Sequence, residues 1–71
     1  MSEVIKPQYR VYYRLFYGID AVISFKDLES MKREIRLHRA EDFDYINACF
    51  ICDDGSEEIV ATGVEEILNV N

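Results

Sequence analysis

The sequence has little glycine, proline or histidine and no tryptophan. Three glycines, one proline and one histidine in 71 residues leave few breaks between apolar segments, and 49% of the residues are hydrophobic. Collagen-like, low-complexity and disordered classes depend on the opposite composition and are excluded. We expect a single domain over residues 1–71, with residues 1–7 as an extended or disordered N-terminal segment.

Long hydrophobic runs are also missing. No run approaches the roughly 18–20 residues of a membrane span, and residues 1–7 lack the basic-then-apolar pattern of a signal peptide. We therefore expect a cytoplasmic protein with reduced cysteines and no membrane partner.

Cysteine occurs only at Cys49 and Cys52, in a C-x-x-C spacing. The surrounding residues favour a strand, in which positions three apart point to opposite faces, so the two thiols are predicted to be small core-type side chains. A structural zinc site needs about four ligands, and His38 alone does not complete one. We predict no metal and no cofactor, and we leave open redox chemistry and a metal shared between copies of the chain.

Basic residues are absent from the C-terminal part of the chain. Residues 41–71 contain nine acidic residues and no lysine or arginine, whereas residues 1–40 contain eight basic and five acidic residues. The first part therefore carries a charge of +3 and the second a charge of -9. Such asymmetry points to a surface of one sign that can steer a partner of the other.

The N-terminal part alternates like a strand over residues 9–17, with odd-numbered residues from Tyr9 to Tyr17 facing the core. A turn at Gly18-Ile19-Asp20 precedes a second strand over residues 21–25, and the short connection predicts an antiparallel hairpin.

A helix is expected next. Ser24 or Asp27 can cap its N-terminus. Its predicted apolar stripe contains Leu28, Met31, Ile35 and His38, with basic residues outside as far as Arg39. We expect Leu37 to be partly exposed and Phe43 to turn inward.

The acidic part is predicted to form a second hairpin, with strands over residues 45–52 and 57–62. With Asp54-Gly55 as a two-residue loop, Phe50 would pair with Ile59 and Ala48 with Ala61. Residues 63–71 are predicted to form a short helical turn and an extended end. The predicted fold is α+β, in the order β-β-α-β-β, with a four-stranded antiparallel sheet and one helix on one face.

One helix leaves the far face of the sheet without a cover. Its predicted interface residues on the first hairpin are Arg10, Tyr12, Arg14 and Phe16, joined by residues such as Tyr45 and Cys49. Tyrosine and arginine are enriched in interface hot spots, so this face is a candidate site for a protein partner or for a homo-oligomer. Stacking on its tyrosines with phosphate neutralisation by its arginines would bind nucleic acid, but the net charge of -6 disfavours that partner.

The acidic residues form the second candidate surface. Neighbouring carboxylates along a strand resemble the phosphates of a nucleic acid, so they could occupy a basic groove of a nucleic-acid-handling enzyme. Their alternative role is that of a solvated face. The predicted acidic edge contains Asp42, Asp44, Asp53, Asp54, Glu57, Glu58, Glu65 and Glu66.

No motif typical of a hydrolase, a phosphate-binding loop or a metalloprotease occurs, and the lone His38 is expected to pack or cap rather than act as a base. We predict a non-enzymatic protein that binds and inhibits another macromolecule. Small acidic α+β chains of this kind are common among phage-encoded inhibitors of host defence, such as anti-CRISPR proteins, which act in the host cytoplasm. The alternatives are a homo-oligomeric interaction module and a nucleic-acid-binding protein.

Overall fold

The computed structural model describes residues 6–71. Its elements follow in the order β1 (Tyr9–Leu15), β2 (Asp20–Phe25), α1 (Leu28–Ile35), a 3-10 turn (Ala40–Asp42), β3 (Phe43–Ile51), β4 (Glu57–Thr62) and α2 (Val64–Leu68). The strands form one antiparallel sheet in the order β2-β1-β3-β4. The predicted α+β fold is thus confirmed, including the short helix near the C-terminus.

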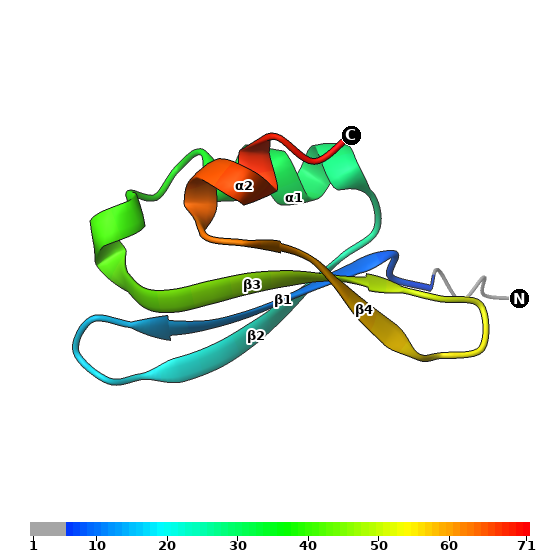
Figure 1. The fold of residues 1–71 in the computed structure, drawn as a ribbon, viewed down its shortest axis with the longest axis horizontal. Coiled ribbons are helices and arrows are strands. Elements are labelled where there is room, and N and C mark those ends of the chain that lie inside the picture. The colour runs from blue at the N-terminus through cyan, green and yellow to red at the C-terminus, as the bar shows by residue number, and fades with distance from the viewer. Residues whose placement is uncertain (1–5) are drawn as a thin grey trace, which may run out of the picture.

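Both helices lie on the same side of the sheet (Figure 1). The core between them and the sheet contains Val11 from β1, Ala48 from β3, Met31 from α1 and Ile67 from α2, all almost fully buried. Edge-on contacts of Tyr9 with Phe50 and of Tyr13 with Phe43 flank this core, with ring centroids 5.5 Å apart in each pair. The opposite face of the sheet carries no helix or strand from residues 6–71.

The helix α1 begins at Leu28, directly after one of its two predicted N-cap residues. Asp27 is its N-cap, and the Asp27 carboxylate accepts a hydrogen bond from the Ser30 backbone N–H at 2.8 Å. The prediction of a longer helix was wrong, because α1 ends at Ile35 and the next residues form turns. His38 therefore lies outside the helix, where its ring packs edge-on against the half-buried Phe43 at 5.7 Å. Leu37 is 75% exposed, as expected.

Both hairpins have three-residue loops with glycine in the last position. Leu15 N–H donates to the Ile19 carbonyl across the first loop, and Cys52 N–H donates to the Ser56 carbonyl across the second. Gly18 and Gly55 close these loops with φ values of 92° and 90°, a region in which glycine is favoured. The first strand consequently stops at Leu15, so the prediction that Tyr17 faces the core was wrong; Tyr17 is 60% exposed.

The second loop and a bulge in β4 change the register of the second hairpin. Ala48 pairs with Ala61 as expected, but Phe50 pairs with Glu58 and not with Ile59. The register shifts between Ala48 and Cys49, which leaves Val60 as the extra residue of a bulge. Because a shift of one residue reverses the face on which side chains project, Ile59 moves to the far side of the sheet.

The prediction for residues 1–7 falls mostly outside the described residues, since the structure describes only Lys6 and Pro7 of that segment and neither belongs to a helix or strand. Among residues 6–71, no helix has the length and apolar character that a membrane crossing requires.

Candidate interaction surface

The face of the sheet opposite the helices is called the open face below. Strand alternation and the observed register bring side chains from all four strands onto it. These residues are Arg10, Tyr12 and Arg14 of β1; Asp20, Val22 and Ser24 of β2; Tyr45, Asn47, Cys49 and Ile51 of β3; and Glu57, Ile59 and Thr62 of β4.

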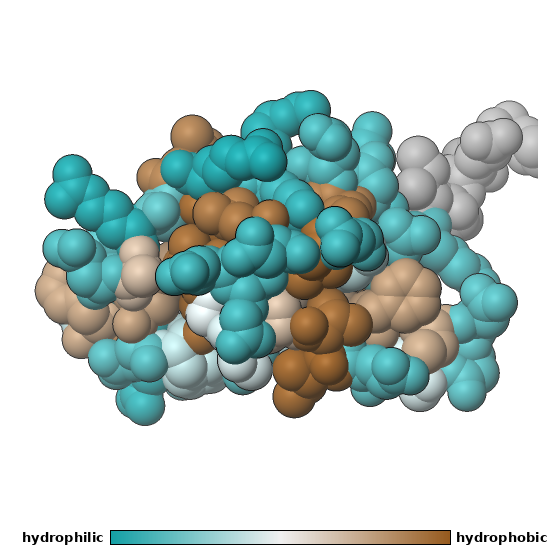
Figure 2. Space-filling model, turned by 45° about the horizontal axis from the view of Figure 1, so that its top comes forward, coloured by the Kyte–Doolittle hydropathy of each residue, from teal (hydrophilic) through white to brown (hydrophobic). Residues whose placement is uncertain are grey.

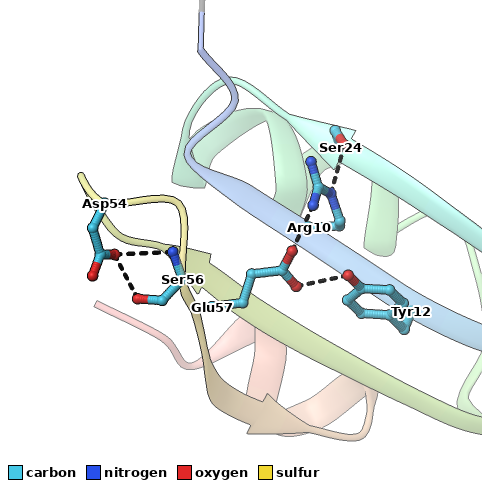
Figure 3. A network of polar contacts seen from close by, with 6 residues as sticks. All are labelled: Arg10, Tyr12, Ser24, Asp54, Ser56 and Glu57. Carbon is cyan, nitrogen blue, oxygen red and sulfur yellow. Dashed lines mark hydrogen bonds and ion pairs between the residues drawn. The ribbon is translucent and has the colours of Figure 1, made fainter.

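A polar network joins three strands across one end of the open face (Figure 3). The Glu57 carboxylate accepts hydrogen bonds from the Arg10 guanidinium and, at 2.7 Å, from the Tyr12 hydroxyl. The Arg10 Nε donates to the Ser24 hydroxyl at 3.2 Å. Glu57 therefore holds Arg10 and Tyr12 of β1 in one orientation from the neighbouring hairpin.

The network changes the protonation chemistry of its members. The hydrogen bond to Glu57 raises the pKa of Tyr12, since deprotonation would break that bond and place two negative charges together. Contact with Tyr12, followed by the hydrogen bond and charge of Glu57, raises the pKa of Arg10. The network therefore stabilises the protonated forms of both side chains.

The second arginine of the open face is also paired. Arg14 Nε lies 3.6 Å from the Asp20 carboxylate, and the Tyr45 hydroxyl donates to the same carboxylate at 3.3 Å. The face thus combines two arginines with two carboxylates and carries no net charge. Each arginine of the face thus lies within ion-pair distance of a carboxylate on the same face.

Apolar side chains stand beside these polar groups. Ile59 is 65% exposed, Val22 is 52% exposed and Tyr45 is 43% exposed. The open face therefore combines exposed apolar side chains with paired charges. The bulge at Val60 is the reason that Ile59 belongs to this group.

Phe16 was predicted to be part of this face but lies in the first hairpin loop. It is exposed, and its ring meets that of Tyr17 edge-on at 4.9 Å. The strand prediction failed there because aromatic residues suit a strand and gave no sign that the glycine-closed loop begins at position 16.

The two cysteines are free thiols that differ in burial, since Cys49 is buried and Cys52 is half-buried. Cys49 projects onto the open face between Arg10 and Ile59, yet it is buried because these longer side chains flank it. Burial, with a smaller contribution from Glu57, raises the pKa of the Cys49 thiol and so favours its protonated form. Among residues 6–71 no cluster of three potential metal ligands occurs.

The structure divides the predicted acidic edge into three separate groups. Asp42 and Asp44 lie at the start of β3, and Asp53, Asp54, Glu57 and Glu58 lie around the second hairpin loop, about 27 Å away along the strand. Glu65 and Glu66 lie on α2, on the helix side. The polar side chains on that side are interspersed with apolar ones (Figure 2).

Half of these carboxylates support local structure. Asp42 accepts from the Arg39 N–H at 3.0 Å, and Glu66 accepts from the Thr62 N–H at 3.2 Å. Asp54 accepts from the Ser56 hydroxyl and N–H, which lowers the pKa of Asp54. Glu57 is bonded in the network described above. The other four carboxylates are exposed and form no hydrogen bond with another described residue: Asp44, Asp53, Glu58 and Glu65.

A cavity of about 110 Å³ lies between α1 and the sheet. Its lining is mainly apolar and includes the side chains of Glu34 and His38, whose Oε2 and Nε2 atoms are 3.4 Å apart. Ligand pockets usually have volumes of roughly 300–1,000 Å³, so this cavity fits at most a very small apolar molecule.

Comparison of the chain with models of protein families, with curated protein sequences and with solved structures finds no match in any of the three.

Proposed function

We propose that the protein is a non-enzymatic binding protein that docks on another protein through its open face and inhibits it by occupying that surface. The single observation that carries this proposal is the exposure of Ile59, Val22 and Tyr45 beside a neutral, hydrogen-bonded Arg-Tyr-Glu network. Because the network already holds Arg10 and Tyr12 in place, these side chains lose less conformational entropy on binding.

The chemistry of the partner follows from the charges around the face. The open face itself is neutral, whereas Asp53 in the second hairpin loop is exposed and negative. A partner with an apolar patch bordered by basic residues fits both features. Such a surface occurs in the grooves of nucleic-acid-handling enzymes, so an inhibitor of one of these, including a phage-encoded inhibitor of host defence, is the favoured form of the proposal.

The test compares matched substitutions on the two sides of the sheet. Ile59→Glu places a charge on the open face, and Leu37→Glu places the same charge on an equally apolar, exposed position on the helix side. The immobilised wild type and both variants are incubated with lysate of the cells in which the protein acts, and the retained proteins are identified by mass spectrometry.

We expect a retained protein that is lost with Ile59→Glu and kept with Leu37→Glu, and whose activity falls on titration with the wild type. Loss with Asp53→Lys as well would indicate that the acidic hairpin loop contributes. Equal retention by wild type and Ile59→Glu, or no retention above background at low salt, would overturn the proposal.

A further inference from the structure

The two edges of the sheet differ in how they are protected. Edge strands expose unpaired backbone N–H and C=O groups, and proteins commonly block them with bulges or charged residues. The edge strand β4 contains both, namely the bulge at Val60 and the adjacent Glu57 and Glu58. The other edge strand, β2, pairs with β1 over six residues with no register shift, and its sequence Asp-Ala-Val-Ile-Ser-Phe has one charge and no proline.

The hydrogen bonds between β1 and β2 show which backbone groups of β2 point away from β1. Leu15 N–H donates to the Ile19 carbonyl at 2.8 Å, which marks a directly bonded pair of the β1–β2 ladder. Bonded pairs recur at every second residue. The backbone groups of Asp20, Val22 and Ser24 therefore point away from β1, and no other segment of residues 6–71 pairs with them.

The outward residues of β2 are complementary to a second copy of themselves. In an antiparallel arrangement centred on Val22, each Val22 lies opposite its equivalent, and Asp20 lies opposite the partner's Ser24. The Ser24 hydroxyl accepts from Arg10 and keeps its own proton to donate to a carboxylate. Lys26 then lies diagonally across from the partner's Asp20, so opposite charges meet twice by symmetry.

The same arrangement covers apolar surface on the helix side of the sheet. Ile19 is 53% exposed, and in this register it lies opposite the partner's Phe25. Ala21 lies opposite the partner's Ile23. Both faces of the seam are therefore compatible with one alignment of the two strands.

We propose that two copies of this chain pair through β2 in antiparallel register centred on Val22. The three bonded pairs would contribute about six main-chain hydrogen bonds and would extend the sheet to twice its strand number. A second copy is favoured over an unrelated peptide because the charge and size pattern of β2 is complementary to itself. The dimer joins two open faces side by side, and it does not depend on what those faces bind.

Disulfide trapping tests the register directly. In a bonded antiparallel pair the Cα atoms are about 5.5 Å apart, which lies within the range that a disulfide spans. Val22→Cys is compared with Ile59→Cys, an exposed position on the same face but at the β4 edge. Both variants also carry Cys49→Ala and Cys52→Ser, because Cys49 pairs with Ile59 and would otherwise form a disulfide within one chain. We expect Val22→Cys to form a covalent dimer under mild oxidation much faster than Ile59→Cys. Equal rates would contradict the proposed seam.

A second variant tests the dimer without cross-linking. Val22→Pro removes an N–H that points outward and so leaves the β1–β2 ladder intact. Because two hydrogen bonds across the symmetry axis are lost, we expect the dissociation constant measured by sedimentation equilibrium to rise about 10- to 100-fold, with an unchanged circular dichroism spectrum. A wild type that stays monomeric throughout the concentration series would overturn the inference.

Binding of a partner by the open face can be tested separately from dimer formation through β2. Ile59→Glu alters the open face at β4, the edge of the sheet farthest from β2, so it should abolish partner retention and leave the dimer unchanged. Dissociation of the dimer by Ile59→Glu would instead indicate packing through the open faces and would refute pairing through β2.

Discussion

Truncation of Ile67 to alanine tests whether α2 is an integral part of the core. Ile67 has no solvent exposure, although it lies on a five-residue helix next to the C-terminus. It packs in the same cluster as Met31 of α1 and Ala61 of β4. A helix this short is unstable by itself in water, so its position depends on burial of this side chain.

The expected loss of stability follows from the atoms removed. Ile67→Ala deletes three carbon atoms, each worth about 0.8 kcal/mol when buried, or about 2.4 kcal/mol. The cavity left behind adds up to about 1.5 kcal/mol if the neighbours do not relax. A domain of this length has a free energy of unfolding of about 4–11 kcal/mol, so the substitution removes a large part of it.

Urea denaturation followed by circular dichroism measures the effect, with Glu65→Ala as the control on the exposed side of the same helix. We expect Ile67→Ala to lower the free energy of unfolding by about 2.5–4 kcal/mol and Glu65→Ala to change it by less than about 0.5 kcal/mol. A loss below about 1 kcal/mol for Ile67→Ala, with an unchanged m-value, would show that α2 does not close the core and would refute this packing.

Four further predictions concern local structure. The hydrogen bonds from Ser30 lower the pKa of Asp27 in the folded state. The Asp27 carboxylate therefore stabilises the fold at pH values above its unfolded-state pKa near 3.8, and this stabilisation is lost as the pH falls through its folded-state pKa. Asp27→Asn should consequently make the free energy of unfolding depend less on pH in the acid range. Gly55→Ala should cost about 1–2 kcal/mol in urea denaturation because φ is 90° there, whereas a cost near zero would show that the loop can change conformation. Deletion of Val60 should preserve the pairing of Ala48 with Ala61 and of Cys49 with Ile59, which amide exchange can check; unfolding of the deletion variant would mean that the bulge is required. Glu57→Gln should lower the pKa of Tyr12, visible as an earlier tyrosinate absorbance change on raising the pH, and an unchanged titration curve would argue against the network in Figure 3.

Local signals predicted the element types and several boundaries. The strand β4 has the predicted limits, and Asp27 caps α1, because alternation and side-chain capping act between residues close in sequence. The acidic loop was recognised as a turn, but its length was wrong by one residue. Both two-residue and three-residue loops accept Asp-Gly, so the dipeptide does not distinguish them.

The candidate site was predictable only in part. Strand alternation placed Arg10, Tyr12 and Arg14 on the open face, and the register confirms that placement. Alternation could not place Glu57 or Ile59 there, because the loop length and the bulge at Val60 together set the face on which β4 side chains project. The pairing of both arginines with carboxylates was likewise invisible in the sequence.

The sequence by itself determined the α+β class, the order of the strands along the chain, the cap of α1 and the charge asymmetry between residues 1–40 and 41–71. Each of these depends on composition or on contacts within a few residues. Only the tertiary structure decided that Glu57 neutralises Arg10, that the acidic residues form three groups, and that β2 is an edge strand with which no other segment of residues 6–71 pairs. These features depend on strand order and register, which are selected by the packing of Val11, Ala48 and Ala61 against Met31 and Ile67 in the core.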